Sequence, residues 1–268
     1  MFRLDGKVAV ITGAGGAICS TVAKDMAGSG AKIALLDLSL ESAQAATEEI
    51  LKAGGEAIAV QTDVLDPESI SRAKDAVIEK YGRVDILVNG AGGNHPKAST
   101  GPEQNFFELS ADAIKWVVDL NLMGTVLPTQ VFGQVMAEQK SGSIVNIASM
   151  ASYRPLTRIM AYSASKAAIV NYTSWMAVHF CQNYSPEIRV NAIAPGFLPT
   201  DQNRFLMLKE DGSPTARGES ILSSTPMARF GRPGEMSGAV IFLCSEAASF
   251  ITGAVLPIDG GFNAFSGV

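Results

Sequence analysis

The stretch that decides the fold is VAVITGAGGAICSTVAKDMAG, residues 8–28. It begins with a run of β-forming residues, Val8–Thr12, passes through the glycine-rich turn GAGG (13–16), and ends in a segment with helical spacing of apolar residues, Ala17–Gly28. A strand, a glycine-rich turn and a helix in this order predict a dinucleotide site, because the N–H groups of the turn and of the helix N-terminus bind a pyrophosphate. The G-x-G-x-x-G fingerprint is incomplete, since its third glycine position is Ile18.

The rest of the chain continues this alternation of apolar runs and helical segments. The predicted strands are Val8–Thr12, Lys32–Asp37, Ala57–Thr62, Val84–Asn89, Gly142–Ala148, Arg189–Ala194 and Ala254–Ile258. The predicted helices are Ala17–Gly28, Leu40–Ala53, Pro67–Tyr81, Ala111–Gln139, Ala161–Tyr184 and Pro233–Ser245. Most strands are continuous apolar runs, which is typical of strands covered on both faces. We therefore predict a single α/β domain over residues 1–268, with a Rossmann-like, doubly wound parallel sheet of about seven strands and helices on both faces.

One segment, residues 199–226, breaks the alternation between the sixth strand and the last helix. It mixes polar residues, glycine and proline with short apolar stretches. An irregular segment of this length is often a binding loop or a lid over a site. We predict a substrate lid here, with a plain surface excursion as the alternative.

The composition narrows the possible partners and the compartment. The chain has a formal net charge of -5 and no run of lysine or arginine, which argues against binding to nucleic acid or to an anionic membrane. Its 3 cysteines are scattered and its 2 histidines are too few for a histidine metal site, so we predict a cytoplasmic location and no metal. No apolar run approaches the length of a membrane span, and a strand that starts by Lys7 leaves no room for a signal peptide.

Polar or small residues follow several predicted strands, at the sheet edge where open α/β sheets bind ligands. The second strand ends at Asp37, whose carboxylate would accept hydrogen bonds from the adenosine ribose and repel a 2′-phosphate. No lysine or arginine follows within 38–40, so NAD is favoured over NADP. The third strand is followed by Asp63 and Val64, and the fourth leads into NGAG (89–92), where small residues let a flat ligand approach the backbone.

A serine, a tyrosine and a lysine follow the fifth strand. Ser149 comes directly after it, and Tyr162-Ser-Ala-Ser-Lys166 opens the next helix. The tyrosine and the lysine are spaced i and i+4, so they share a helix face. Alone the pair has little weight, because a solvated helix face produces it too. Its weight comes from the order along the chain, which is glycine turn, acidic ribose partner, strand-end serine and then Tyr-x-x-x-Lys.

With these features the chain resembles the short-chain dehydrogenase/reductase family over essentially its full length. The family pattern has T-G-x-x-x-G-x-G near the N-terminus, N-N-A-G after the fourth strand and an Asn–Ser–Tyr–Lys tetrad. The matching residues are Thr12, Gly13, Asn89, Ala91, Gly92, Asn121, Ser149, Tyr162 and Lys166. NAIAPG (191–196) resembles the stretch beside the nicotinamide, and PIDGG (257–261) the end of the last strand. Two positions depart from the pattern, since the second and third loop glycines of the family are Ala17 and Cys19 here.

The resemblance implies a role for each residue of the tetrad. Tyr162 would be the general acid in reduction and the base in oxidation, with its pKa lowered by the ammonium of Lys166 and by the oxidised nicotinamide ring. Lys166 would also bind the nicotinamide ribose, Ser149 would hydrogen-bond the substrate oxygen, and Asn121 would hold a water that links the lysine to solvent. The predicted cofactor contacts are Gly13, Gly15, Gly16, Ala17, Ile18, Asp37, Leu38, Asp63, Val64, Asn89, Ala91, Gly92, Tyr162, Lys166, Pro195, Gly196, Leu198 and Thr200.

Basic residues flank the predicted pocket from two segments, 89–100 and 152–162. A cationic pocket suits a hydroxylated carboxylate better than a steroid or an acyl chain. The predicted substrate contacts are His95, Lys97, Ser149, Arg154, Arg158 and Gln202. For each basic residue the plain alternative is a solvated surface charge.

A closer resemblance, to the subgroup described as D-mannonate oxidoreductases, rests on GAGGNHP (90–96) and PGFLPTDQNR (195–204). It implies NAD(H)-dependent interconversion of a secondary alcohol and a ketone on a sugar acid, mannonate and fructuronate in that subgroup. The alternatives left open are a 3-oxoacyl-thioester reductase, a polyol or gluconate dehydrogenase of the same family, and a nucleotide-binding protein without turnover. The helix that Tyr162 opens is apolar on more than one face, which predicts a homo-oligomer, either a tetramer or a dimer.

Overall fold

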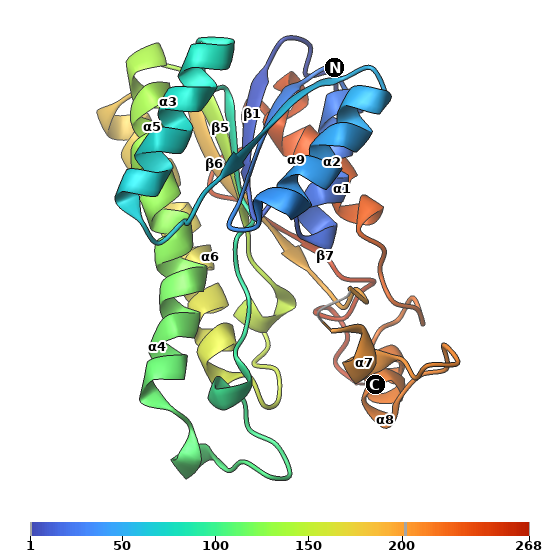
Figure 1. The fold of residues 1–268 in the computed structure, drawn as a ribbon. Coiled ribbons are helices and arrows are strands. Elements are labelled where there is room, and N and C mark those ends of the chain that lie inside the picture. The colour runs from blue at the N-terminus through green and yellow to red at the C-terminus, as the bar shows by residue number, and fades with distance from the viewer. Residues whose placement is uncertain (1, 201–202, 268) are drawn as a thin grey trace.

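Seven parallel strands form one sheet in the computed structural model of the chain, which describes residues 2–200 and 203–267 (Figure 1). The strands are β1 (Val8–Thr12), β2 (Lys32–Asp37), β3 (Glu56–Gln61), β4 (Ile86–Asn89), β5 (Gly142–Ile147), β6 (Ile188–Pro195) and β7 (Val255–Ile258). Their order across the sheet is β3-β2-β1-β4-β5-β6-β7. The chain builds outward from β1 on one side and then returns to β1 with β4. Ligands of such sheets bind at this reversal, beyond the carboxyl ends of the strands.

Helices cover both faces of the sheet (Figure 1). The α-helices are α1 (Ala17–Gly28), α2 (Leu40–Lys52), α3 (Pro67–Tyr81), α4 (Ala111–Val118), α5 (Gly124–Gln139), α6 (Met160–Asn183), α7 (Arg204–Met207), α8 (Ala216–Ser223) and α9 (Gly234–Cys244). Helices α1, α2 and α9 pack on one face, and α3, α5 and α6 pack on the other. Helix α4, the first turns of α6 and the pair α7 and α8 project beyond the edge at which the strands end (Figure 1).

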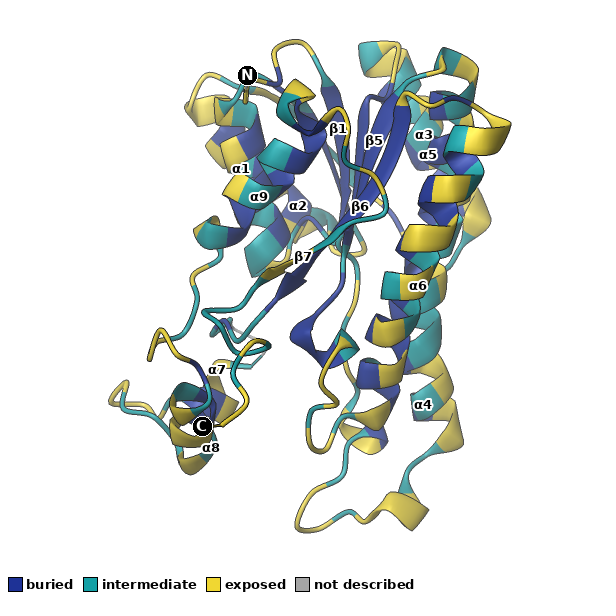
Figure 2. Ribbon diagram, turned by 180° about the vertical axis from the view of Figure 1, so that it is seen from behind, coloured by how far each residue is buried: buried dark blue, intermediate teal, exposed yellow. Residues whose placement is uncertain are grey.

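Both faces of the sheet are apolar, because successive strand residues point to opposite sides. In β1, Ala9 and Ile11 belong to the core that includes α1 and α9, whereas Val8 and Val10 belong to the core that includes α3 and α5. All four side chains are at most 1% exposed. Figure 2 shows the strands as a buried layer between two sets of helices. The predicted fold class, a doubly wound parallel sheet, is confirmed.

Local signals place the ends of the elements close to where the sequence predicts them. Helix α3 starts with Pro67 in its first turn and with the Asp66 side chain accepting the Glu68 N–H at 2.9 Å. It ends at Gly82, which is in the left-handed region with φ +77°. The seven predicted strands and five of the six predicted helices are present, with ends shifted by at most two residues.

The remaining predicted helix, the fourth along the chain over 111–139, is corrected in its middle. Helix α4 is followed by a π-helical turn, η3 (Asp119–Met123), and only then by α5. Such turns contain one residue more than an α-helical turn and are frequent at functional sites. Asn121, at the centre of η3, is fully buried. Apolar spacing does not indicate the turn, because one extra residue leaves the pattern on either side helical.

The segment 199–226, predicted to be irregular, contains α7 and α8 in its described part. Thr215 caps α8, since its Oγ1 accepts the Gly218 N–H at 3.0 Å. Helices of 4 and 8 residues are too short to give a periodic signal. Gln202, a predicted substrate contact, lies outside the described residues, and the lid stays a prediction. Within the described ranges, no helix has both the length and the apolar content to cross a membrane.

Candidate active site

The turn between β1 and α1 has the conformation and the open N–H groups that an anion requires. Gly13 is in the left-handed region with φ +63°, and a Cβ atom on it would lie 2.8 Å from backbone atoms of Ala91. Gly16 is the N-cap of α1, and no described side chain caps the N–H groups of the first turn. These N–H groups are therefore open to a phosphate at the positive end of the helix dipole.

The carboxylate at the end of β2 is held in place by this turn. Asp37 Oδ2 accepts the Gly15 N–H at 2.8 Å, and Oδ1 accepts the Ser39 N–H at 2.9 Å. A carboxylate has about four acceptor positions, so two remain for ribose hydroxyls. Among the ion pairs of the described residues, none involves Asp37, so its negative charge is not neutralised. The adjacent Leu38 is 67% exposed and offers an apolar surface beside the carboxylate.

Tyr162 and Lys166 lie on α6 beside Ser149. Lys166 is 4% exposed, and its Nζ donates to the Ile147 carbonyl at 2.7 Å and lies 5.7 Å from the centre of the Tyr162 ring. Burial lowers the pKa of Lys166 to about 8. The Tyr162 hydroxyl is hydrogen-bonded to the Ser149 side chain, and burial raises the tyrosine pKa despite this bond. The expectation that Lys166 lowers the Tyr162 pKa is thus corrected for the chain itself, while the effect of the oxidised nicotinamide ring stays a prediction. The phenol is protonated at neutral pH, in the form that donates a proton.

Asn121 secures the loop after β4 next to Lys166. Its Nδ2 donates to the Gly93 carbonyl at 2.7 Å and to the Val117 carbonyl at 2.8 Å. A Cβ atom on Gly92 would lie 2.7 Å from Asn121 Oδ1 and 3.2 Å from Lys166 Nζ, so only glycine leaves this approach open. The structure therefore brings together all four residues of the predicted tetrad. The water that Asn121 was expected to hold stays a prediction.

A buried polar ladder under the site was not foreseen. Asn89 Nδ2 donates to Asn146 Oδ1 at 2.9 Å and to Thr129 Oγ1 at 3.0 Å, and Asn146 Nδ2 donates to Thr173 Oγ1 at 2.9 Å. The ladder ties β4 and β5 to α5 and α6, and all four side chains are at most 2% exposed. The predicted contact of Asn89 with a cofactor would therefore use its backbone. The polar Asn146 inside an apolar strand was the signal that could have revealed the ladder.

Cys19, one of the two departures from the family pattern in the glycine turn, packs against a further departure in the loop after β4. The second asparagine of N-N-A-G is Gly90 here, and a Cβ atom on it would overlap the Cys19 Sγ atom. The Cys19 side chain therefore occupies space that is free only because residue 90 has no side chain. Burial raises the pKa of the Cys19 thiol to about 12, so the thiol is protonated and unreactive at neutral pH.

Gly90→Ala should destabilise the folded chain by about 1–3 kcal/mol, the usual cost of overpacking. The new Cβ atom would overlap Cys19 Sγ and lie 2.8 Å from the Thr12 carbonyl oxygen. Adding Cys19→Gly removes the overlap with the sulfur but not the contact with the Thr12 carbonyl. The free energy of unfolding that the double variant loses should therefore be smaller than the sum of the losses in the two single variants. Urea unfolding of the four proteins measures this coupling. Equal costs of Gly90→Ala in the two backgrounds would show that the thiol does not fill this space.

Two predicted cofactor contacts follow β3. Asp63 is exposed, and its Oδ1 accepts the Leu65 N–H at 2.8 Å. Val64 is buried and packs on Gly124, on which a Cβ atom would lie 3.0 Å from the valine Cγ2. The valine thus joins the end of β3 to the start of α5, and the role of both residues toward a cofactor stays a prediction.

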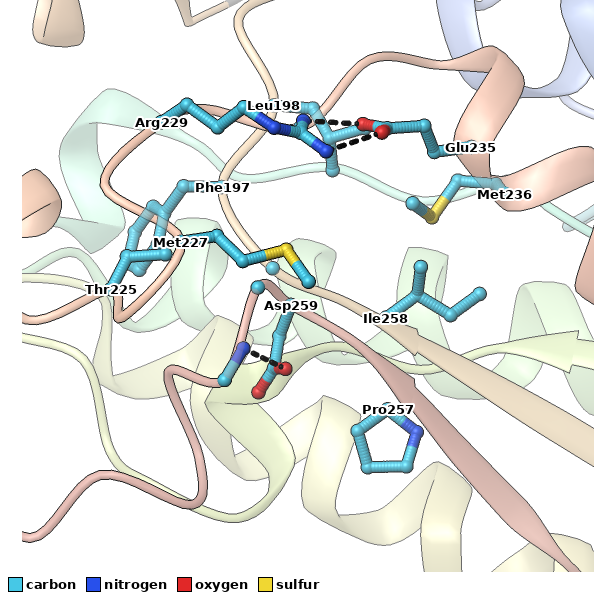
Figure 3. A pocket seen from close by; sticks show the side chains of 14 residues that line it. Phe197, Leu198, Thr225, Met227, Arg229, Glu235, Met236, Pro257, Ile258 and Asp259 are labelled. Atoms are coloured by element: carbon cyan, nitrogen blue, oxygen red, sulfur yellow. Dashed lines mark hydrogen bonds and ion pairs between the residues drawn. The ribbon is translucent and has the colours of Figure 1, made fainter.

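The predicted contacts after β6 adjoin a cavity of about 370 Å³ (Figure 3). Gly196 and Leu198 line it, while Pro195 ends β6 and the Thr200 N–H donates to an asparagine Oδ1 at 2.7 Å. Figure 3 shows the Met227 side chain projecting across the cavity, beneath the ion pair between Arg229 and Glu235 of α9. No residue of the tetrad lines this cavity. It therefore lies beside the candidate active site and does not contain it.

Two of the predicted substrate contacts lie on the loop after β4. His95 Nδ1 accepts the Lys97 N–H at 3.1 Å, and the histidine ring packs edge-on against Trp116 with 5.6 Å between ring centres. The Lys97 side chain is exposed and forms no ion pair among the described residues. His95 thus has a structural role in the loop, and contact of either residue with substrate stays a prediction.

The two predicted arginines differ in their surroundings. Arg154 donates to the Asn263 carbonyl from Nε at 3.1 Å and from Nη2 at 2.7 Å, so it is tied to the C-terminal segment. Arg158 is exposed two residues before α6. Arg154 has few donors left for a ligand, whereas the guanidinium of Arg158 has no hydrogen bond or ion pair to any of the residues that the structure describes.

Known proteins resemble this chain over nearly all of its length. Residues 13–263 match the protein-family model described as enoyl-(acyl carrier protein) reductase. The uncharacterized oxidoreductase UxuB of Bacillus subtilis (strain 168) is 46% identical over 275 residues, which cover 99% of this chain and 98% of the relative. D-threitol dehydrogenase of Mycolicibacterium smegmatis is 38% identical over 262 residues, 98% of this chain and 95% of the relative. A crystal structure with bound NAD, of a Haemophilus influenzae protein proposed to be a D-mannonate oxidoreductase, has a TM-score of 0.93 and 46% identity, and covers 99% of this chain and 98% of that one.

Proposed function

The chain belongs to the short-chain dehydrogenase/reductase family, and from this premise we propose which alcohol it oxidises. It is an NAD(P)-dependent oxidoreductase that acts on alcohol groups. Our proposal is that it interconverts a secondary alcohol and a ketone on a sugar acid, with D-mannonate and D-fructuronate as the leading pair. The observation that carries the reaction type is the Tyr162 hydroxyl bonded to Ser149 with the Lys166 ammonium beside it.

The residues around the glycine turn fit a dinucleotide. A Cβ atom on Gly13 would collide with the Ala91 backbone and one on Gly15 with the Ser42 side chain, so the two glycines allow the close packing that shapes the turn. The N–H groups at the start of α1 would hold the pyrophosphate. Asp37 would bind the adenosine ribose through its two open acceptor positions. When bound, the cofactor supplies or accepts the hydride. The uncompensated charge of Asp37 favours NAD over NADP, and the NAD-bound relative is consistent with that choice.

The proton side of the reaction belongs to the tetrad. Tyr162 would donate its proton to the substrate oxygen in reduction and take it back in oxidation. Ser149, which now shares its hydrogen bond with the tyrosine, would hold the same oxygen. Lys166 stays close enough to favour the phenolate after the proton has left, because its ammonium lies 5.7 Å from the ring centre.

The sugar-acid part of the proposal has two supports. A solved relative is itself proposed to act on D-mannonate, and exposed basic residues, Lys97 and Arg158, lie on the two loops that flank Tyr162. A polyol dehydrogenase and an acyl-thioester reductase remain as alternatives, in line with the threitol relative and with the description of the family model.

A screen of initial rates tests the function. NADH and NADPH are each offered with D-fructuronate, other keto-sugar acids, neutral ketoses and an acetoacetyl thioester. We expect the highest kcat/KM with NADH and a keto-sugar acid. A higher value on a neutral ketose would move the assignment to the polyol class, and a higher value on the thioester would move it to the acyl reductases. Stoichiometric cofactor binding without any turnover would support a nucleotide-binding role.

Asp37→Ala should weaken NADH binding roughly 10-fold, the loss expected for hydrogen bonds to a charged group. It should also narrow the preference for NADH over NADPH, because the charge that repels a 2′-phosphate is removed. Titration of the fluorescence of both cofactors measures the two affinities. Asp25→Ala removes an exposed carboxylate from α1 and serves as the control. An unchanged ratio of the two affinities in Asp37→Ala would refute the assigned role.

We also propose a homo-oligomer, either a dimer or a tetramer, and a cytoplasmic location. Helix α6 keeps large apolar side chains at its surface, with Trp175 58% and Val178 56% exposed. The His179 ring stacks on Trp175 with 4.6 Å between ring centres, which makes one continuous aromatic surface. Sedimentation velocity gives the subunit number, and a monomer at micromolar concentration would contradict this part.

A further inference from the structure

An arginine of the segment 199–226, called the insert below, reaches the loop that leads into α6, the helix of Tyr162 and Lys166. Arg217, on α8, donates from Nη1 to Thr157 Oγ1 at 3.4 Å, across 60 positions of sequence. Thr157 is the neighbour of Arg158, one of the predicted substrate contacts. Helix α8 thereby brings a second guanidinium to the loop before α6, and no local feature of the sequence predicts this.

The two guanidinium groups lie close enough to repel each other. Burial, and in addition the positive charge of Arg158, lowers the pKa of Arg217. Neither arginine forms an ion pair in the part of the chain that the structure describes. Two unneutralised guanidinium groups at one place form a local field that attracts an anion. Arginine forks match the geometry of a carboxylate, with two parallel N–H donors for its two oxygens.

The backbone at Arg158 has a conformation that is unfavourable for a residue with a side chain. Its φ is +76°, in the left-handed region. The Arg158 carbonyl accepts the Thr100 N–H at 2.9 Å, and this bond fixes the strained turn between the two loops that flank the site. Strain of this kind concentrates at ligand clamps. The turn lies four residues before Tyr162, so it adjoins the reacting group.

We propose that Arg158 and Arg217 together bind the carboxylate of the substrate, the first from the loop before α6 and the second from helix α8 of the insert. This inference rests on the proposed sugar-acid function and adds to it a residue that determines specificity. A carboxylate bound between the two arginines would attract both of them and offset their mutual repulsion. It would also connect helix α8 to the loop before α6. Arg154 does not fill this role, because the Asn263 carbonyl occupies it.

A binding experiment without turnover tests the pair. The enzyme is saturated with NADH, with which an alcohol substrate cannot react, and is titrated with D-mannonate, D-gluconate and D-galactonate, followed by cofactor fluorescence. The neutral polyol D-mannitol is titrated in parallel. Arg158→Gln and Arg217→Gln should each weaken the binding of the best aldonate roughly 10- to 100-fold and change D-mannitol binding little. Lys209→Gln removes one exposed charge from the same insert and should bind all ligands like the wild type.

The outcomes separate this inference from the proposed function. Unchanged aldonate affinity in Arg217→Gln, in a variant with the melting temperature of the wild type, would overturn the pair even if the wild type turns over sugar acids. Failure of every aldonate to bind the wild type would overturn it as well. If aldonate binding requires both arginines but the protein reduces no keto-sugar acid, the result would support carboxylate binding by Arg158 and Arg217 and would contradict the proposed function.

Discussion

Tyr162→Phe lowers kcat on the best substrate by at least ~10²-fold, the low end for a positioned acid–base group, and leaves NADH affinity nearly unchanged. The substitution keeps the ring that packs beside Lys166 and removes only the hydroxyl that Ser149 now binds. Because burial raises the tyrosine pKa, the phenol enters the reduction with its proton in place, and phenylalanine has no proton to give. The loss should therefore appear in kcat and not in cofactor binding.

A second tyrosine of α6 provides the matched control. Tyr172 is also hydrogen-bonded, to Thr129, and burial raises its pKa to about 12. It is partly buried, packs against the core that includes α3 and α5, and is not a member of the tetrad. Tyr172→Phe should cost about 1 kcal/mol of stability and leave kcat unchanged. Near-normal turnover by Tyr162→Phe, or an equal loss of kcat in Tyr162→Phe and Tyr172→Phe, would contradict the assignment of Tyr162 as the acid–base group.

Lys166→Met should lower kcat/KM by at least ~10²-fold and at the same time stabilise the fold at pH 7. The loss of activity follows from the removal of the charge that favours the phenolate. The gain in stability follows from burial, which lowers the lysine pKa from 10.5 to about 8. At about 1.4 kcal/mol for each pKa unit, holding this ammonium in the folded chain costs about 3 kcal/mol at neutral pH. Methionine removes that cost and loses the bond to the Ile147 carbonyl, about 1 kcal/mol, so the net gain is about 2 kcal/mol.

The pH dependence identifies the cause of this gain. Between pH 8 and 10.5 the unfolded chain holds the lysine proton and the folded chain does not, so the free energy of unfolding of the wild type rises with pH in this window. The advantage of Lys166→Met should therefore be full below pH 8 and fade toward pH 10.5. Urea unfolding of both proteins at pH 7 and pH 10 measures the difference, with the exposed Lys115→Met as control. A stability difference that does not change with pH would contradict a buried charge at Lys166.

The sequence by itself determined the sheet and the positions of the reacting groups along it. Continuous apolar runs bounded by turn residues, such as Val8–Thr12, are typical of strands covered on both faces, and parallel strands place all their carboxyl ends at one edge. A residue at the end of a strand, such as Asp37, or just after one, such as Ser149, is therefore expected at the site without any knowledge of packing. The i, i+4 spacing of Tyr162 and Lys166 likewise sets them on one helix face. These features depend on local geometry, which the residue order carries.

Tertiary structure alone decided the contacts between elements that are distant along the chain. The fit of Cys19 against Gly90, the protonated state of Tyr162 and the approach of Arg217 to Arg158 all depend on how separate helices and loops pack. The π-helical turn that places Asn121 beside Gly93 is set by the same packing. No periodic pattern encodes such contacts, because each depends on the distance between two surfaces and on the water excluded between them, and both exist only once the chain has folded.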